Sequence, residues 1–356
     1  MSTETWRLVL RPLSTFLTGL HSDTILGHLA WMAAYRDGTE IDELVRRFRA
    51  DPPFVLSSGF PHDWLPAPVL PPLGEEEKER LALECFPEPD PATARARLQV
   101  ALRKIAALGF LPMTDWRQLA RGLDAFGLAR HLLGEPPAGE VGQAGTSSSR
   151  RADVVKARLD AMMQEQTVMR TAVDRLTGSG LEGRLYDHNE TGYSREARID
   201  VWFRFFDPGY KDKVLSWLED LAVQGFGANA SSGAGRFEIL SFQRTESLLP
   251  EAEEGNAFMA LSHFVPAAGD PVSGWYHHMV KRGKLGGTMA CSPPPGAATS
   301  GAHVWKHPLI MLTPGSVFRH NGRARLLYGR IVENIYPPDN RIVQFAHCFP
   351  FQVHLP

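Results

Sequence analysis

Hydrophobic and polar positions along the chain follow two periods, which together predict a mixed fold. A period of two marks strands, and a period of 3.6 marks helices with one apolar face. Six segments read, in order, as strand, helix, strand, strand, helix and strand: residues 6–11, 22–35, 54–57, 198–206, 211–223 and 237–242. This βαββαβ order is the split βαβ, or ferredoxin-like, arrangement. The pattern therefore predicts an α+β fold built on a ferredoxin-like (RRM-like) domain.

A large insertion separates the two middle strands and covers about residues 61–195. Helical patterns within it lie at 75–83, 92–108, 115–133 and 151–162. Residues 134–149 are rich in Gly, Ser and Pro, which predicts a loop. Residues 166–193 contain turn residues between two extended stretches, which predicts a protruding hairpin.

Beyond residue 245 the pattern contains strand candidates but no clear helix. The candidates lie at 258–264, 308–313, 326–332 and 342–347. We therefore divide the chain into a first ferredoxin-like domain over 1–245 and a second, degenerate one over 246–356. With 356 residues and 43% hydrophobic content, both parts have enough apolar residues for a core.

Composition narrows the cellular setting. The first residues lack a basic stretch followed by a long apolar one, so no signal peptide is expected. No apolar run is long enough to span a membrane. The three cysteines, Cys85, Cys291 and Cys348, are far apart and odd in number. They predict no disulfide framework, so we expect a reducing, cytoplasmic location.

Charge is distributed unevenly along the chain. The net charge is −2, but residues 275–356 contain nine Lys or Arg against two acidic residues, hence +7, which leaves −9 for the rest. Clustered positive charge can neutralise phosphates and release counterions. The alternative is an ordinary solvated face, and charge alone does not separate the two.

The segment from Gly225 to Phe237 (GFGANASSGAGRF) follows a predicted helix and precedes a strand. Its glycines permit positive φ and close backbone approach. Free N–H groups there, with Ser231, Ser232 and Arg236, could bind phosphate oxygens. No Lys-Ser/Thr pair follows, and the segment does not follow a strand, so it is neither a P-loop nor a dinucleotide fingerprint. A glycine-rich turn without a ligand is the alternative.

Two further segments are candidates for RNA contact. Within the predicted hairpin, Arg170, Arg175 and Arg184 are spaced so that they could face RNA, although a plain surface hairpin is the alternative. At 21–27 (HSDTILG), Ser22 or Asp23 could cap a helix whose N-terminus favours an anion. His21 could act as an acid or base, or simply pack.

Taken together and in this order, these segments resemble the RAMP superfamily of CRISPR-associated RNA-binding proteins, within it the Cas5-group subunits of type III-A (Csm) effector complexes. The resemblance rests on HSDTILG at 21–27, VDRLTG at 173–178 and GFGANASSGAGRF at 225–237. FVLSSGFP at 54–61 and QFAHCFP at 344–350 also look similar to that group. The central loop lacks the lysines often found there, which leaves backbone and hydroxyl contacts.

This resemblance implies a pair of ferredoxin-like domains and a non-catalytic role in antiviral defence. The subunit would bind the repeat-derived 5′ tag of the crRNA and meet target RNA only indirectly. It would dock a large polymerase/cyclase-like subunit and a backbone RAMP subunit, with no cofactor, metal or membrane. The predicted RNA-binding residues are His21, Ser22, Arg170, Asp174, Arg175, Thr177, Gly178, Arg184, Gly225, Phe226, Gly227, Ser231, Ser232, Gly233, Gly235, Arg236 and Arg319.

Three alternatives stay open at this point. The chain could be a metal-independent endoribonuclease that processes CRISPR RNA, with His21 as general acid or base. It could be the equivalent subunit of a Cmr or Csx relative. It could also hold zinc through His303, His307 and Cys291, although Trp305 and Pro308 favour a strand or loop over the helix that would align both histidines.

Overall fold

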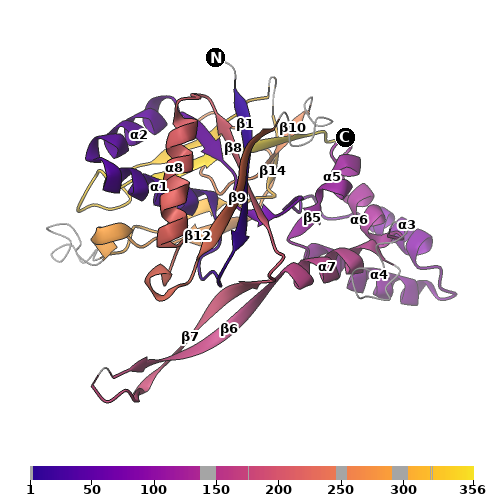
Figure 1. The fold of residues 1–356 in the computed structure, drawn as a ribbon. Coiled ribbons are helices and arrows are strands. Elements are labelled where there is room, and N and C mark those ends of the chain that lie inside the picture. The colour runs from indigo at the N-terminus through magenta and orange to yellow at the C-terminus, as the bar shows by residue number, and fades with distance from the viewer. Residues whose placement is uncertain are drawn as a thin grey trace.

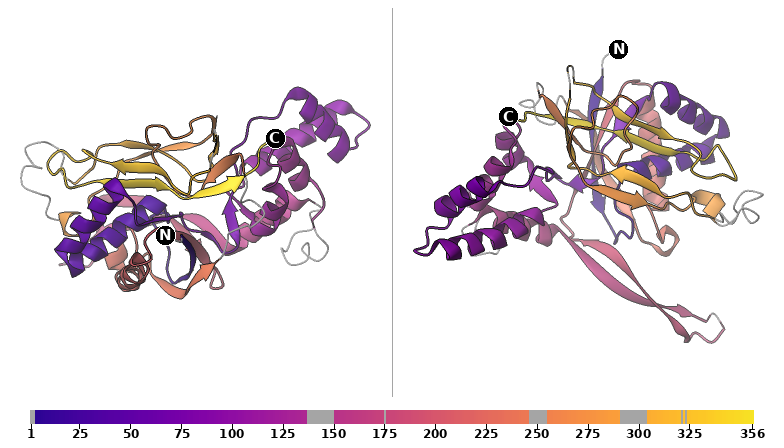
Figure 2. Two further views of the ribbon diagram at one scale, coloured as in Figure 1. Left: turned by 90° about the horizontal axis from the view of Figure 1, so that it is seen from above. Right: turned by 180° about the vertical axis from the view of Figure 1, so that it is seen from behind.

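The computed structural model has an α+β fold in which two antiparallel sheets form separate layers (Figures 1 and 2). It describes residues 3–136, 150–174, 176–245, 255–290, 304–320, 322 and 324–356. The predicted α+β class is confirmed. None of the helices in these described ranges is long and apolar enough to cross a membrane.

The first sheet contains the four strands predicted from the sequence. Its order is β2 (Phe54–Leu56), β8 (Ile199–Phe205), β1 (Glu4–Pro12) and β9 (Phe237–Thr245), with every neighbour antiparallel. The central pair β1–β8 aligns Leu8 with Val201. This order is the one that the split βαβ arrangement requires, because β1 and β2 flank the strand that returns between them.

Two predicted helices cover one face of this sheet. They are α1 (Ser22–Arg36) and α8 (Tyr210–Gln224), and α2 (Gly38–Ala50) extends the layer beside α1 (Figure 1). Alternation along β1 turns Leu8 and Leu10 into the core, where Leu29 and Val214 are fully buried. The apolar faces read from the sequence are therefore the faces that pack.

The second sheet is made of short strands from the C-terminal part. Its order is β11 (Gly274–Trp275), β14 (Val317–Arg319), β10 (Ala257–Ala260) and β17 (Pro350–Val353). Two ribbons accompany it: β12 (His278–Lys281) with β13 (Leu309–Leu312), and β15 (Tyr328–Val332) with β16 (Gln344–Cys348). Within the described part of 255–356 there is no α-helix, so a second ferredoxin-like domain stays a prediction.

The two layers share their apolar cores. Val55 and Trp202 of the first sheet pack in one cluster with Met259 and Phe351 of the second. On the helical side, the Phe345 ring lies 4.9 Å from the Phe48 ring, centroid to centroid. The boundary proposed at residue 245 is therefore bridged by packing on both sides.

The insertion forms a helical lobe between β2 and β8, seen at the right of Figure 1. Its helices are α3 (Glu75–Cys85), α4 (Pro91–Ala106), α5 (Met113–Leu119), α6 (Ala125–Leu133) and α7 (Arg151–Met162), beside the short strands β3 (Phe60–Pro61), β4 (Trp64–Pro66) and β5 (Phe110–Pro112). The single helix predicted over 115–133 is two helices. Asp124 caps the second through the Gly127 N–H, 2.7 Å away. Most of the predicted loop 134–149 lies outside the described residues.

The predicted hairpin is present and projects away from the body. It consists of β6 (Met163–Val173) and β7 (Gly180–Tyr193), paired from Met163–Tyr193 outward (Figures 1 and 2). Its base is held by the Phe16–Thr191 bridge and by a bond from the Thr15 hydroxyl to Glu190, 3.1 Å long.

Candidate nucleic-acid interface

A groove of about 1220 Å³ lies between α1, the Gly-rich loop and the C-terminal ribbons. We call it the α1 groove. It is lined by Thr24 and His28 of α1, by residues 227–229 of the loop and by residues 281–287, 306 and 339–345 of the C-terminal part. The fold thus brings the segments 21–27 and 225–237 together with the basic C-terminal part, although the three lie far apart in the sequence.

The α1 groove carries uncompensated positive charge. Its lining cations include Arg282, Lys284 and Lys306, and within the described part of the chain none of the three forms an ion pair. Arg49 and Arg341, by contrast, are paired with Glu333 and Asp339. The unpaired cations are the groups available to an anion such as a phosphate.

Lys306 is the most enclosed of these cations. Its Nζ donates to the Gln344 side-chain oxygen at 3.2 Å and to the Val343 carbonyl at 3.5 Å, both neutral. Burial lowers the pKa of Lys306 to about 8. The ammonium is therefore charged at pH 7. The Asp23 carboxylate acts on it from nearby but, among the described residues, no carboxylate forms an ion pair with it, so it can still bind a phosphate.

Aromatic side chains accompany the cations. Trp31 lines the groove, with Tyr35 one helical turn away at 5.6 Å between ring centroids. Trp305 is 45% exposed, and the Arg282 guanidinium lies 5.7 Å from its ring centroid. Trp31 is half-buried against Gly286 and Gly287, and Trp305 lies outside the groove lining, so the exposed Trp305 ring is the one suited to stacking an unpaired base.

The Gly-rich loop is shaped by positive φ angles, as predicted. Gly225, Gly227, Gly233 and Gly235 all have φ between 67° and 90°. A side chain on Gly227 would place its Cβ 2.6 Å from the Thr18 Cβ, so the loop closes directly on the segment after β1.

Much of the loop backbone is already hydrogen-bonded within the protein, which reduces the number of N–H groups that the expected phosphate contact could use. The N–H of Gly227 donates to His28 Nε2 at 3.1 Å, and that of Ala228 donates to the Thr18 hydroxyl at 3.0 Å. Those of Gly235 and Arg236 donate to Thr15 and Ser14. Burial lowers the pKa of His28 to about 4, which keeps its ring neutral and able to accept. The hydrogen bonds fasten the loop to the chain after β1.

The loop residues predicted to contact RNA therefore have different roles. Phe226 is 1% exposed and packs in the core against Phe16 and His28, so it cannot stack on a base in this conformation. Gly225, Gly233 and Gly235 set the backbone. Ser231, Ser232 and Arg236 are exposed but do not line the groove.

The N-terminus of α1 also differs from expectation. His21 is the N-cap residue and makes no side-chain cap, so capping by Ser22 or Asp23 is wrong. The His21 ring stacks on His263 at 4.0 Å, and the Ser22 N–H donates to the Ser58 hydroxyl. Neither His21 nor Ser22 lines the α1 groove. Burial lowers the pKa of His21 and, more strongly, that of His263.

On the hairpin, Asp174 shapes the tip. Its carboxylate accepts from the N–H groups of Leu176 (2.7 Å) and Thr177 (3.2 Å), and Gly178 has a φ of 68°. Arg170 lies 3.7 Å from Glu190. Arg175 lies outside the described residues, as does the side chain of Arg184 in β7.

The two remaining sequence candidates lie away from the groove. Arg319, in β14, donates to the Pro356 carbonyl at 2.7 Å and does not line the α1 groove. Of the zinc alternative, Cys291 and His303 lie outside the described residues, and His307 is exposed.

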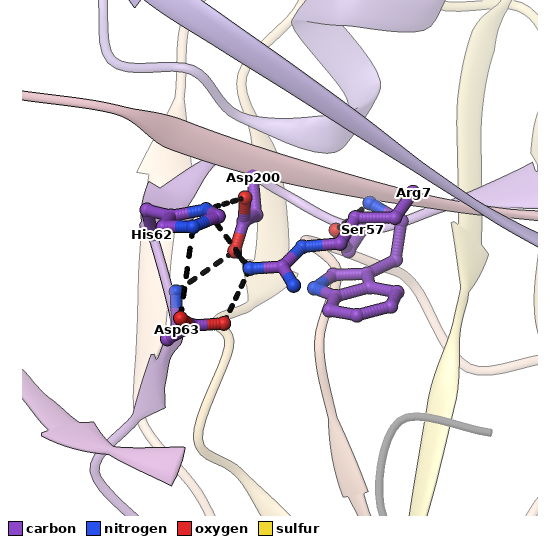
Figure 3. Close-up of polar contacts among 6 residues, drawn as sticks. Arg7, Ser57, His62, Asp63 and Asp200 are labelled. Atoms are coloured by element: carbon purple, nitrogen blue, oxygen red, sulfur yellow. Dashed lines mark hydrogen bonds and ion pairs between the residues drawn. The ribbon is translucent and has the colours of Figure 1, made fainter. Parts of the chain in front are cut away.

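A second polar cluster, not found from the sequence, joins β1, β8 and the turn after β3 (Figure 3). Asp200 is fully buried and accepts from Arg7 (2.5 Å), from the Asp63 N–H (2.9 Å) and from His62 Nδ1 (2.8 Å). The hydrogen bond to Asp200 raises the pKa of His62. Arg7 also contacts His62 and Asp63, so its guanidinium occupies the middle of the cluster. The signal for this cluster was an aspartate within the apolar strand 198–206.

The groove cations Lys281, Arg282, Lys284 and Lys306 were likewise not named as site residues from the sequence. Their only signal was the excess of Lys and Arg after residue 275. The structure adds that these four cations, together with Arg341, converge on one groove.

Comparison with solved structures agrees with this architecture. A chain of a Csm3–Csm4 subcomplex of a type III-A CRISPR–Cas interference complex superposes with a TM-score of 0.60 at 13% identity, covering 98% of this chain and 99% of that one. A chain of a Csm1–Csm4 cassette in complex with cA4 gives a TM-score of 0.53 at 16% identity, covering 99% of both chains. No family model and no curated protein matches the sequence. Both complexes contain Csm4, and this chain shares its fold with one chain of each complex.

Proposed function

We propose that this protein is a non-catalytic RNA-binding subunit of a type III-A (Csm) CRISPR effector complex. In this proposal it grips the repeat-derived 5′ tag of the crRNA and links the large polymerase/cyclase-like subunit to a backbone RAMP subunit. The observation that carries it is the α1 groove, where Arg282, Lys284 and Lys306 form no ion pair with any residue that the structure describes. The whole-length likeness to chains of Csm1–Csm4 and Csm3–Csm4 complexes supports the choice of assembly.

The groove fits a single strand better than a duplex. Unpaired bases can be splayed apart and stacked on aromatic rings, whereas a duplex offers mainly its backbone. Trp305 supplies an exposed ring next to Arg282, one of the cations that would hold the phosphates. Backbone contacts would position the strand, and stacking would hold its bases.

The hairpin is the second element of the proposal. Met169, Leu185 and Tyr186 are more than half exposed on its two strands, and Leu176 at the tip is 96% exposed. Apolar side chains on a projection without its own core favour a partner surface. We infer that the hairpin packs against RNA or a backbone subunit at the border between tag and spacer.

The C-terminal layer belongs to the same proposal. We infer that residues 246–356 are a reduced ferredoxin-like domain whose described part keeps the sheet and contains no α-helix. The likeness to RAMP-containing complexes over nearly the whole chain supports this assignment.

The nuclease alternative gains no support from the site. His21 stacks on His263 and lies outside the lining of the groove, so a strand bound in the groove would not meet it. Incubating the protein with repeat RNA should leave the RNA intact. Cleavage by the wild type that is lost in His21→Ala would reverse this assignment.

The decisive experiment measures crRNA retention by complexes assembled from co-expressed subunits. Arg282→Ala/Lys284→Ala should weaken binding of a 5′-tag RNA at least tenfold, because a hydrogen bond to a charged group contributes about 1.5–3 kcal/mol. The slope of log K against log salt should fall by about 0.7 for each lost phosphate contact.

The matched control is Arg80→Ala/Arg95→Ala, which removes the same charge from the helical lobe, where both arginines pair with glutamates. It should leave affinity and salt slope unchanged. An equal loss in both variants would mean unspecific attraction, and no loss in the groove variant would exclude this groove as the RNA site.

A further inference from the structure

Three side chains with metal-binding chemistry meet behind the N-terminus of α1. They are His21, Asp23 and His263, and one ligand atom from each lies within 4.8 Å of the others. His263 comes shortly after β10 of the second sheet, whereas His21 and Asp23 lie at the start of α1. Residues far apart in the sequence therefore form the cluster. Neither the groove nor the hairpin uses these imidazoles.

One oxygen of the Asp23 carboxylate in this cluster lacks a hydrogen-bond partner among the described residues. Its side chain is fully buried, and its Oδ2 accepts from Gln344 at 2.6 Å and from Lys281. Within the described part of the chain, its buried Oδ1 has no hydrogen-bond partner. A buried carboxylate oxygen without a partner is costly and calls for a cation or donor that the protein itself does not provide.

The neighbouring histidines are held ready for such a ligand. Their rings stack at 4.0 Å, an arrangement open to neutral imidazoles and opposed for two imidazolium ions. His263 Nδ1 lies 3.0 Å from the Ser58 hydroxyl, which itself accepts from the Ser22 N–H. Such outer hydrogen bonds orient metal-ligating histidines and leave the other ring nitrogen for the metal.

We propose that His21, Asp23 and His263 form a binding site for a divalent transition-metal ion, with Zn²⁺ as the reference ion. Two imidazoles and a carboxylate are a common donor set for Zn²⁺ and Fe²⁺, with one or more positions left to water. In a tetrahedral site, bonds of about 2.0–2.1 Å place the ligand atoms about 3.3 Å apart, closer than the 4.8 Å within which these atoms lie. This proposal replaces the expectation from the sequence that the protein binds no metal.

Lys281 is the local competitor for this ion. Its ammonium already binds Asp23 Oδ2, so it opposes a second cation nearby. The cluster of His62, Asp63 and Asp200 has a similar donor set, but Arg7 contacts all three of its residues. A guanidinium therefore fills that cluster, whereas the Lys281 ammonium reaches only Oδ2 of Asp23 and Oδ1 has no hydrogen-bond partner among the described residues. The contrast supplies a control within the same chain.

The test is a Zn²⁺ titration of the full-length protein after removal of metal with EDTA, followed calorimetrically. The Co²⁺-loaded protein, observed by visible absorption, reports the ligand set. Wild type should bind one equivalent, and His263→Gln and His21→Gln should each weaken binding at least tenfold. His62→Gln should bind like the wild type, and Lys281→Met should bind more tightly.

Far-ultraviolet circular dichroism in EDTA shows whether each variant is folded, and His21→Gln serves if His263→Gln is not. The proposal is overturned if the wild type binds no Zn²⁺. It is equally overturned if His62→Gln loses binding while both histidine variants of the cluster retain it. None of these outcomes depends on RNA binding.

Discussion

Gly235 shows how tightly a single position constrains the Gly-rich loop. Its φ is 67°, and an added Cβ would lie 1.9 Å from the Phe226 carbonyl oxygen. Positive φ alone costs a residue with a side chain roughly 1–2 kcal/mol. At Gly235 a clash with rigid backbone adds to that cost.

We therefore expect Gly235→Ala to lower the free energy of unfolding by more than about 2 kcal/mol, because the cost of positive φ and the cost of the clash add. Gly233 is the matched control, because its φ is 90° and an added Cβ meets nothing within 4 Å. Chemical denaturation of both variants separates the two effects. Equal losses would mean that the contact with Phe226 relaxes without cost.

Lys306 gives the groove a pH dependence. Its pKa is about 8, so the ammonium that would bind a phosphate loses its proton as the pH rises through that value. RNA affinity should fall by about tenfold from pH 7 to about pH 9, the worth of one charged hydrogen bond. Lys306→Arg should remove this step, because a guanidinium stays charged throughout. Parallel curves for both proteins would show that another group titrates.

Residue roles were the least predictable part of the site. From the sequence, Phe226 and Arg236 are both predicted to contact RNA, yet Phe226 is buried and Arg236 is exposed. Asp174 closes a turn through two N–H groups, a role that sequence spacing supports as well as RNA contact. Which side chain faces the groove depends on long-range packing, and a motif does not encode it.

At the level of elements, the hairpin is the part least connected to the core. β6 and β7 pair mainly with each other, and the body holds them through Phe16, Thr15 and the residues at their base. Two strands without a covering layer add little to global stability.

Replacing residues 169–187 by a two-residue Asn-Gly turn, which joins the paired residues Val168 and His188, should therefore change the free energy of unfolding by less than about 1 kcal/mol. Thermal melting of the isolated protein checks this. The same deletion should reduce retention of crRNA or of the backbone subunit in the assembled complex. A protein that melts normally and assembles normally would contradict the role proposed for the hairpin.

Long periodic elements were predictable, and short ones were not. The helices 22–35 and 211–223 and the strands of the first sheet lie where their periodicity places them. β11 and β14 have two and three residues, too few for a period to show. The break between α5 and α6 falls at residues 120–124, where Gly122 is a poor helix former and Asp124 caps the new helix.

Across the whole molecule, the two layers should unfold together. Phe345 packs its ring on Phe48 and belongs to the core beneath α1 and α2. We expect Phe345→Ala to lower the free energy of unfolding by about 3–5 kcal/mol. Leu83→Ala, at a position 72% exposed, should have little effect.

For the wild type and for both variants, intrinsic fluorescence and circular dichroism should report one coincident unfolding transition. Two separated transitions in the wild type would mean that the domains proposed at residue 245 fold independently after all. The sequence indicates the order of strands but not this sharing of cores, because the contacts join segments up to 300 residues apart.

The place of Phe345 and Phe351 near the end of the described chain has a consequence during synthesis. A ribosome makes α1, α2 and the first sheet long before it makes β16 and β17, which cover their apolar surfaces. The nascent chain therefore carries an exposed hydrophobic face through most of its translation. Until those strands are made, such a face is prone to aggregation.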